Sequence, residues 1–245
     1  MKHSEKIILI TIISFATIIS AIIIGNAYST RGKITNKIEV TGKAERNFTA
    51  DLIVWNGSFS KQKKEMKEAF KQLKADEIMV KEYLLKKGIK EEEVVFSSVQ
   101  IQKVYDDFYN DKGSYNRIFA GYKLSQDVSI SSQDIDKIEK ISREVSELID
   151  MGVELTSDAP DFFYTKLSDL KLELVEDATT DGRTRAEKIA NSAKARLGKL
   201  LYANLGIFQI TGQNSNENYS WGGALNTKSK EKTASITVRL NFETK

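Results

Sequence analysis

The chain of 245 residues has no cysteine, one proline and one histidine, and these shortages exclude several kinds of chemistry. Without cysteine there is no disulfide, no thiolate metal ligand, no cysteine nucleophile and no lipid-modified cysteine. The histidine, His3, precedes the N-terminal hydrophobic run, so the rest of the chain has no imidazole for base catalysis or metal binding. Histidine-dependent catalytic triads are therefore excluded from it.

Phosphate-binding and nucleic-acid-binding patterns are also missing. The sequence contains neither G-x-x-x-x-G-K-S/T nor G-x-G-x-x-G, so it gives no support for a nucleotide enzyme. Lys and Arg number 37 against 34 Asp and Glu, and 40% of the residues are hydrophobic. This balance predicts a globular domain without a strongly basic surface, and we expect no nucleic-acid partner.

Charged residues are absent from positions 7–30, and this run is rich in Ile, Leu, Ala, Thr and Ser. About 20 apolar residues are needed for a helix to cross the hydrocarbon core, and residues 7–27 supply that length. We predict a short tail (1–6), a transmembrane signal anchor (7–27) that takes the lipid bilayer as partner, and a juxtamembrane linker (28–37). The alternative is a cleavable signal peptide, with Gly25 and Ala27 as small residues before a cut at Tyr28.

The charges that flank this run do not favour a cytoplasmic N-terminus. Lys2 and Lys6 precede it, offset by Glu5, whereas three basic residues follow it: Arg31, Lys33 and Lys37. Long domains are translocated largely regardless of such local charges. We therefore predict a single-pass protein of the cell membrane with residues 31–245 outside the cytoplasm, or a secreted protein if the signal is cleaved.

Alternation of apolar and polar residues predicts strands along the remaining chain. The predicted strands cover residues 38–44, 52–59, 95–101, 122–130, 200–210 and 236–242, with a strand-like segment at 153–155. Three segments show helical spacing instead: 66–84 before Gly88, 135–149 between an Asp134 cap and Gly152, and 168–197 before Gly198. In the third helix, Gly182 predicts a bend or weak point.

This order of elements predicts an α+β fold over residues 38–245, with three main helices packed on a mixed or antiparallel sheet. The internal order also carries a resemblance. Residues 38–45, IEVTGKAE, resemble the opening strand of the SIMPL domain family, and Gly88-Ile89 with residues 91–98 resembles its helix-to-strand junction. Gly121-Tyr122 resembles the "GY" strand of that family, and residues 185–190 with Leu197-Gly198 resemble its alanine-rich helix and terminal "LG".

The resemblance spans residues 38–242 and has three departures. Ala44 replaces a frequent glycine, Ala50-Asp51 replaces Pro-Asp, and Gly182 replaces alanine. Membership in this family implies an α+β domain exported to the periplasm or cell surface, which in some members assembles into large homo-oligomers. It implies no agreed catalytic chemistry. We accordingly assign no catalytic, cofactor-binding or metal-binding residue and expect a homo-oligomer.

Two acidic clusters were weighed as sites. Asp106, Asp107, Asn110 and Asp111 offer oxygen ligands for Ca²⁺ in a predicted turn, but they lack the spacing and the bidentate Glu of an EF-hand loop. Glu176, Asp177 and Asp181 lie on the third helix, where paired carboxylates serve acid/base catalysis in a hydrolase or lyase. For both clusters we favour a solvated acidic surface.

The polar segment 212–230 is the strongest candidate for function. It carries two large rings, Tyr219 and Trp221, beside Gly222-Gly223, and such rings are favoured anchors of protein interfaces. The alternative is that both rings fold back on the edge of the domain. We predict a membrane-anchored, extracytoplasmic SIMPL-like domain that works by assembly or partner binding, without assigned catalysis. The rivals are a small-ligand binder with a pocket beneath this segment and a carboxylate-dependent hydrolase or lyase.

Overall fold

The computed structural model describes residues 3–31, 37–109 and 115–245, without the side chains of residues 3–7, 9 and 28–31. Several sequence-based inferences concern residues outside this description. They are the flanking charges of the hydrophobic run other than Lys37, the side chain of His3, the side chain of Tyr28 at the predicted cut, and the two predicted turn ligands Asn110 and Asp111.

The hydrophobic run forms helix α1 (His3–Arg31). Its segment Ile10–Ala27 is long and apolar enough to cross a membrane, as an anchor or a signal sequence. Within α1, the hydroxyls of Ser14 and Thr17 donate to the carbonyl oxygens of Ile10 (2.9 Å) and Ser14 (2.8 Å). These bonds satisfy both hydroxyls without water, which is what a hydrocarbon environment requires.

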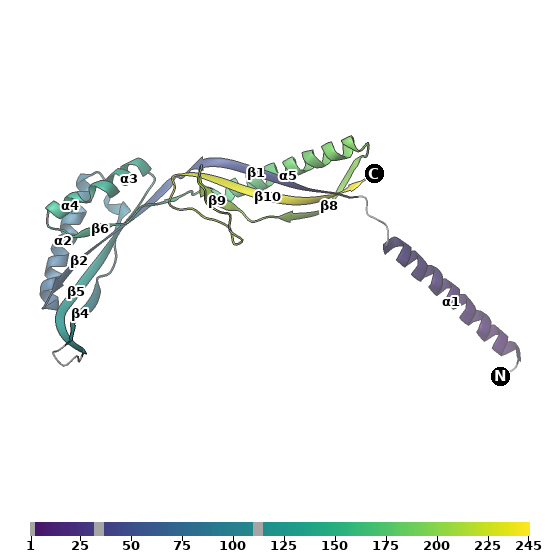
Figure 1. Cartoon of the computed structure of the whole chain (residues 1–245), viewed down its shortest axis with the longest axis horizontal. Helices are drawn as coiled ribbons and strands as arrows, with labels where there is room; N and C mark the ends of the chain where they lie inside the picture. Colours follow the sequence, from purple (N-terminus) through teal and green to yellow (C-terminus); the bar gives the residue numbers. More distant parts are fainter. Residues whose placement is uncertain (1–2, 32–36, 110–114) are drawn as a thin grey trace. The chain divides into compact units, whose positions relative to one another are not determined.

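The remaining chain is α+β with antiparallel sheets, and the predicted fold class is confirmed (Figure 1). The strands are β1 (Lys37–Thr49), β2 (Leu52–Lys63), β3 (Val94–Phe96), β4 (Gln100–Tyr109), β5 (Tyr115–Ser132), β6 (Leu155–Ser157), β7 (Asp161–Phe163), β8 (Leu197–Leu205), β9 (Gln209–Gly212) and β10 (Glu231–Thr244). The helices are α2 (Met66–Lys86), the short 3-10 helix η1 (Glu91–Glu93), α3 (Ile135–Glu144), α4 (Glu147–Asp150) and α5 (Leu167–Ser192).

The strands form two sheets. The larger has the order β3-β5-β2-β6, with β4 also on β5 and β7 also on β2, and the smaller has the order β1-β10-β8, with β9 on β10. The chain divides into two compact units. Unit 1 comprises Met1–Gly42, Gly182–Asn204 and Arg239–Lys245, and unit 2 comprises Lys43–Asp181 and Leu205–Val238.

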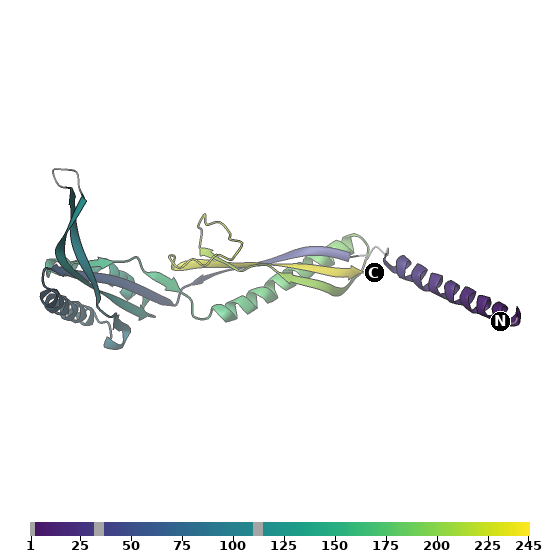
Figure 2. The ribbon, with the colours of Figure 1, turned by 90° about the horizontal axis from the view of Figure 1, so that it is seen from below.

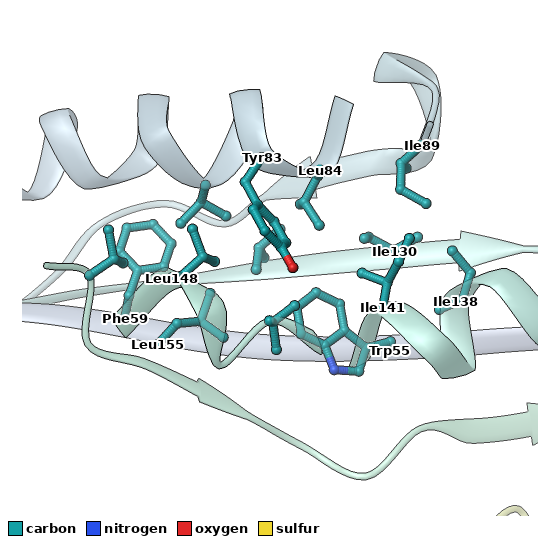
Figure 3. Packing of buried hydrophobic residues seen from close by; sticks show 14 of the residues in the cluster. Trp55, Phe59, Tyr83, Leu84, Ile89, Ile130, Ile138, Ile141, Leu148 and Leu155 are labelled. Atoms are coloured by element: carbon teal, nitrogen blue, oxygen red, sulfur yellow. The ribbon is translucent and has the colours of Figure 1, made fainter. Parts of the chain in front are cut away.

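The main core of unit 2 lies between the larger sheet and its helices. Every second residue of β2 points into this core, including Ile53, Trp55 and Phe59, and α2, α3 and α4 supply the facing side chains (Figure 3). The indole Nε1–H of Trp55 donates to Ser157 Oγ at 2.9 Å, which pairs its polar group inside the core. The alternation of apolar and polar residues that predicted strand β2 therefore arises because one face of the strand is buried.

Strand β5 needs a glycine where β2 ends. Residue pairing between β2 and β5 runs from Ile53↔Ser132 to Lys63↔Tyr122, and Gly121 is the residue of β5 next to this last pair. Its φ of +140° is unfavourable for other residues, and a Cβ there would lie 2.4 Å from the carbonyl oxygen of Lys63. The pairing of β5 with β4 also shifts at this place, since Val104 faces Gly121 and Tyr105 faces Phe119. A β-bulge thus re-aims the outer half of β5.

Helix α5 is continuous from Leu167 to Ser192, through Gly182. A Cβ at Gly182 would lie 2.7 Å from Leu240 Cδ1 and 3.2 Å from the backbone nitrogen of Gly42. The helix therefore approaches the strands closely at Gly182, where a larger residue would not fit. The helix ends at Ser192, five residues before the predicted end at Leu197, which opens β8 instead.

Three predicted elements are interrupted, each by a local hydrogen bond or close approach. The second helix splits at Val145, because Leu148 N and Ile149 N bond only three residues back. The strand at 95–101 splits into β3 and β4, where Asp127 N donates to the hydroxyl of Ser97 at 2.9 Å. The strand at 200–210 splits at Gly206, whose amide donates to Thr237 O at 2.8 Å.

Candidate functional site: the aromatic loop

The aromatic loop is the segment 213–230, which leaves β9 and returns through β10. The pairing Lys232↔Gly212 closes the loop at its base, and Ile210 forms a bridge with Leu225 inside it. The segment is polar in sequence, yet it is tied to the rest of unit 2 by side-chain hydrogen bonds that the spacing of residues did not reveal. Three side chains, Gln209, Glu217 and Lys232, make most of them.

Gln209 holds the middle of the loop. Its side chain is buried, and its Oε1 accepts hydrogen bonds from the backbone nitrogens of Ser220 (3.1 Å) and Ala224 (2.8 Å). Its Nε2 donates to Ser220 O at 2.9 Å. One amide side chain therefore pairs backbone groups on both sides of Trp221, and it fixes the turn that carries this residue.

Glu217 and Asn226 hold the two ends of the loop together. Glu217 Oε2 accepts a bond from Gly212 N at 3.0 Å, and its Oε1 accepts one from Asn226 Nδ2. The side-chain oxygen of Asn226 accepts in turn from Ser229 N at 2.8 Å. Charged and amide groups thus tie the two ends of the loop together.

Lys232 lies beneath these bonds and is 2% exposed. Its ammonium donates to the carbonyl oxygen of Asn226 at 2.5 Å. Burial lowers the pKa of Lys232, while the nearby carboxylates of Glu217 and Asp161 oppose that shift. Asp161 of β7 also accepts a bond from the hydroxyl of Thr227 at 2.7 Å, so β7 supports the second half of the loop.

The two predicted interface rings lie at the surface of this braced loop. Trp221 is 96% exposed and Tyr219 is 60% exposed, and Ser235 Oγ donates to the Tyr219 hydroxyl at 3.4 Å. Trp221 does not fold back on the domain edge, whereas Tyr219 keeps one polar contact with β10. The arrangement presents one indole on a backbone that is held in place from below.

A cavity of about 530 Å³ lies beside these rings. Its walls come from the loop, from the segment before β9, from β1 and from β10: Lys43, Gly206, Ile207, Gln209, Tyr219, Ser220, Trp221, Ser235, Ile236 and Thr237. Lys43 pairs with Glu45 at 2.5 Å, and this hydrogen bond raises the pKa of the lysine. The cavity therefore combines apolar and aromatic walls with one ammonium group at its edge.

Two of the three candidate carboxylates of α5 are bound to β1. Asp177 pairs with Arg46 of β1 at 2.7 Å, and Asp181 accepts a bond from the backbone nitrogen of Lys43 at 2.9 Å. Glu176 is exposed. Arg46 also pairs with Glu173, so these acidic groups connect α5 to β1.

The acidic cluster of the predicted turn is placed differently from the expectation. Asp106 and Asp107 lie in strand β4, and Asp107 pairs with Arg117 of β5 at 3.0 Å. Among the side chains that the structure describes, no group of three or more acidic or histidine residues is arranged to hold a metal ion. Asp107 therefore takes part in an ion pair between neighbouring strands rather than in a turn.

The protein is thus an α+β domain that follows an apolar N-terminal helix and carries a braced aromatic loop. Residues 38–242 match the model of the SIMPL family, which is described as a protein of unknown function (DUF541). The match covers most of the chain, so the protein belongs to the SIMPL family. A search of the curated proteins found no match.

Proposed function

We propose that this protein is a single-pass membrane protein whose residues 31–245 lie outside the cytoplasm and bind proteins through the aromatic loop. The bound proteins are other copies of this chain or a partner in the cell envelope. The proposal assigns no catalysis. One observation carries it: Trp221 is 96% exposed on a turn that Gln209 fixes with three hydrogen bonds.

The physical argument concerns the cost of binding. An interface loses free energy when flexible side chains and loops must become ordered, and a loop already braced by buried hydrogen bonds has less to lose. Trp and Tyr combine a large contact area with few rotatable bonds, which makes them frequent anchors of binding energy. A solvated indole on a braced turn is the arrangement expected of such an anchor.

The test uses full-length protein in detergent, with its absolute mass measured by light scattering on a sizing column. We expect wild type to form a discrete oligomer and Trp221→Ala to shift it to a smaller species. Phe70→Ala is the control, because Phe70 is an exposed ring on α2, away from the loop. A wild-type monomer would contradict self-assembly through the loop. Equal masses for wild type and both variants would show that Trp221 does not contribute to self-assembly.

The membrane orientation has its own test, which the absence of cysteine makes simple. A cysteine introduced at Asn216, an exposed loop position, would be the sole thiol of the chain. We expect a membrane-impermeant maleimide to label it in intact cells, with the protein recovered in the membrane fraction. Labelling only after lysis would place the domain in the cytoplasm, and recovery in the medium would indicate a cleaved signal.

The cavity beside Tyr219 favours a second candidate function, the binding of a small ligand. Its apolar walls and the ammonium of Lys43 suit an amphiphilic anion of aromatic or fatty-acid type. Such a ligand should raise the unfolding temperature of wild type, because it binds the folded state alone. The increase should be smaller in Lys43→Gln, and an unchanged unfolding temperature across a panel of these acids would count against this candidate.

A further inference from the structure

Strand β4 forms a long open edge of the larger sheet. Its residues Gln100–Tyr109 pair with β5 on one side, and no described strand lies on the other. The other strands at the margin of this sheet, β3, β6 and β7, have three residues each. An open edge of this length exposes a row of backbone N–H and C=O groups, which is a template for pairing with another strand.

The outer parts of β4 and β5 form a two-stranded arm that leaves the sheet (Figure 2). The β2–β5 pairing ends at Tyr122, so the arm has no third strand in the described chain. Aromatic contacts follow the arm, with ring-centre distances of 5.1 Å for Phe119 and Tyr122 and 5.8 Å for Tyr105 and Phe119. Tyr109, near its outer end, is 74% exposed. A two-stranded ribbon with exposed rings is marginally stable alone, so a further strand would stabilise it.

The sequence of β4 is complementary to itself when read in the opposite direction. Two identical antiparallel edges meet about a two-fold axis, which places one residue opposite its own copy. With Tyr105 on that axis, Lys103 lies opposite Asp107 of the second copy, and this pair occurs twice. Ile101 then lies opposite Tyr109 of the second copy. The face therefore consists of one Tyr–Tyr pair, two ion pairs and two apolar pairs.

Neighbouring symmetric registers lack this complementarity. With Val104 on the axis, Lys103 would face Tyr105 and Asp107 would face Ile101, so neither charge would have an ionic partner. The Tyr105 register leaves only Asp106 without one, opposite Val104. With Asp106 on the axis, two like charges would lie directly opposite each other, which destabilises a pair of strands. Strand β8 is also an edge, but Leu197–Leu205 contains Lys199 and no acidic residue, so it offers no such ion pair.

We propose that two copies of this chain pair antiparallel along β4, with Tyr105 on the two-fold axis, and so join their larger sheets into one. This inference rests on the proposed assembly function and names a contact distinct from the aromatic loop. Asp107 keeps its intrachain partners Arg117 and Tyr115, because a carboxylate has about four lone-pair sites and can accept from Lys103 of the second copy as well.

The Cys-free chain allows a sharp geometric test by disulfide formation. In the proposed register the two Tyr105 Cα atoms lie roughly 4.5–5.5 Å apart, as directly opposed residues do, and that range suits a disulfide. Val104 is the matched control, one residue away. Its two Cα atoms would lie roughly 8 Å apart, beyond the reach of a disulfide.

The experiment uses full-length protein in lipid vesicles under mild oxidation, with covalent dimers measured on a non-reducing gel. We expect Tyr105→Cys to become mostly dimer and Val104→Cys to remain at the level of random collisions. No cross-linking at either position, or equal cross-linking at both, would overturn the proposal. Thermal unfolding of each reduced variant checks that the fold is intact, so that a failure reports on pairing.

Charge exchange tests the ion pair separately. Lys103→Glu alone and Asp107→Lys alone each place like charges opposite one another in a homodimer, and we expect both to lose the pairing along β4, measured as Tyr105→Cys cross-linking in each background. A one-to-one mixture restores opposite charges in the mixed dimer, so association should return. Because unfolded proteins would not regain affinity on mixing, an absence of recovery would contradict the register.

The loop and the strand edge are then compared in one background. We expect Tyr105→Cys to cross-link equally well with and without Trp221→Ala, while larger assemblies require Trp221. Dimers without larger species in wild type would leave the edge pairing standing and remove the assembly role of the loop. Large species without cross-linking of Tyr105→Cys would support the assembly role of the loop and overturn the pairing along β4.

Discussion

Gln209 and Ser220 exchange two hydrogen bonds, one in each direction. The backbone nitrogen of Ser220 donates to Gln209 Oε1 at 3.1 Å, and Gln209 Nε2 donates to Ser220 O at 2.9 Å. The side-chain amide of Gln209 thus makes the backbone hydrogen bonds that a neighbouring strand would otherwise make. Since Ser220 directly precedes Trp221, the position of the exposed indole depends on the buried side chain of Gln209.

We predict that Gln209→Leu destabilises the domain and loosens the loop. The substitution keeps an apolar filling but leaves two backbone N–H groups and one C=O without their partner, at a cost of about 1–3 kcal/mol. Denaturant unfolding measures the loss, and limited proteolysis should cut the segment 213–230 faster. Gln213→Leu is the control, and equal cleavage in both variants would show that Gln209 does not brace the loop.

A second prediction concerns the ion pair of Lys61 and Asp76 beneath α2. Their charged groups lie 3.1 Å apart with side-chain exposures of 19% and 4%, although the Asp76 oxygen facing Lys61 makes no hydrogen bond of normal geometry. Burial raises the pKa of Asp76, while Lys61 opposes that shift. The lysine also donates to Gly152 O at 3.1 Å.

Lys61→Met should cost about 3 kcal/mol in the free energy of unfolding, because it leaves a buried carboxylate without its cation. Asp76→Leu in the same chain should recover most of that loss, since the pair is then replaced by apolar groups. Chemical denaturation of both variants measures the difference. A double variant as unstable as Lys61→Met would show that lost packing, rather than the unpaired charge, causes the effect.

The sequence predicted those features of the fold that depend on one residue and its near neighbours. The alternation in β2 and β10 and the apolar stripe of α3 record burial on one face, so their existence followed from spacing. The breaks at Ser97, Val145 and Gly206 did not, because each depends on hydrogen bonds or contacts that spacing does not encode.

In the candidate site, too, some residues could be predicted from the sequence and others could not. Tyr219 and Trp221 were identifiable as large rings in a polar segment. Gln209 was not, since it occupied an ordinary position in a predicted strand, and nothing local indicates that its amide reaches the backbone 11 residues away. The close approach at Gly182 was not predictable either, because a glycine that allows close approach has the same sequence signature as one that weakens a helix.

A third prediction concerns acid sensitivity at the end of α2. Lys87 lies 2.9 Å from both Glu144 and Glu147, and its hydrogen bonds lower the pKa of each carboxyl group. A lowered pKa in the folded state stabilises the protein above the unfolded pKa, about 4.3 for Glu, and this stabilisation is lost as pH falls through the folded value.

Lys87→Met should therefore flatten the dependence of the unfolding temperature on pH below about 4.3, the pKa of an unperturbed Glu. Lys86→Met is the matched control, since Lys86 is the exposed neighbour on the same helix. The measurement is thermal unfolding by circular dichroism from neutral to acidic pH. Parallel curves for wild type and Lys87→Met would show that these pairs do not contribute to acid unfolding.

The last prediction separates backbone conformation from steric space at two glycines. Gly88 and Gly121 both have positive φ, +86° and +140°, but a Cβ at Gly88 would meet nothing within 4 Å. A Cβ at Gly121 would lie 2.4 Å from the backbone oxygen of Lys63, which cannot turn away as a side chain can. Gly88→Ala should thus cost only the conformational strain, about 1–2 kcal/mol.

Gly121→Ala should cost at least about 3 kcal/mol, because the β2–β5 pairing must open at Lys63 to admit the methyl group. It should also change the aim of the β4–β5 arm, so that disulfide formation through Tyr105→Cys falls while Gly88→Ala leaves it unchanged. Denaturant unfolding and cross-linking of the two variants give both answers. Equal losses at the two glycines would mean that β5 moves aside freely, and the arm would then not be aimed by Gly121.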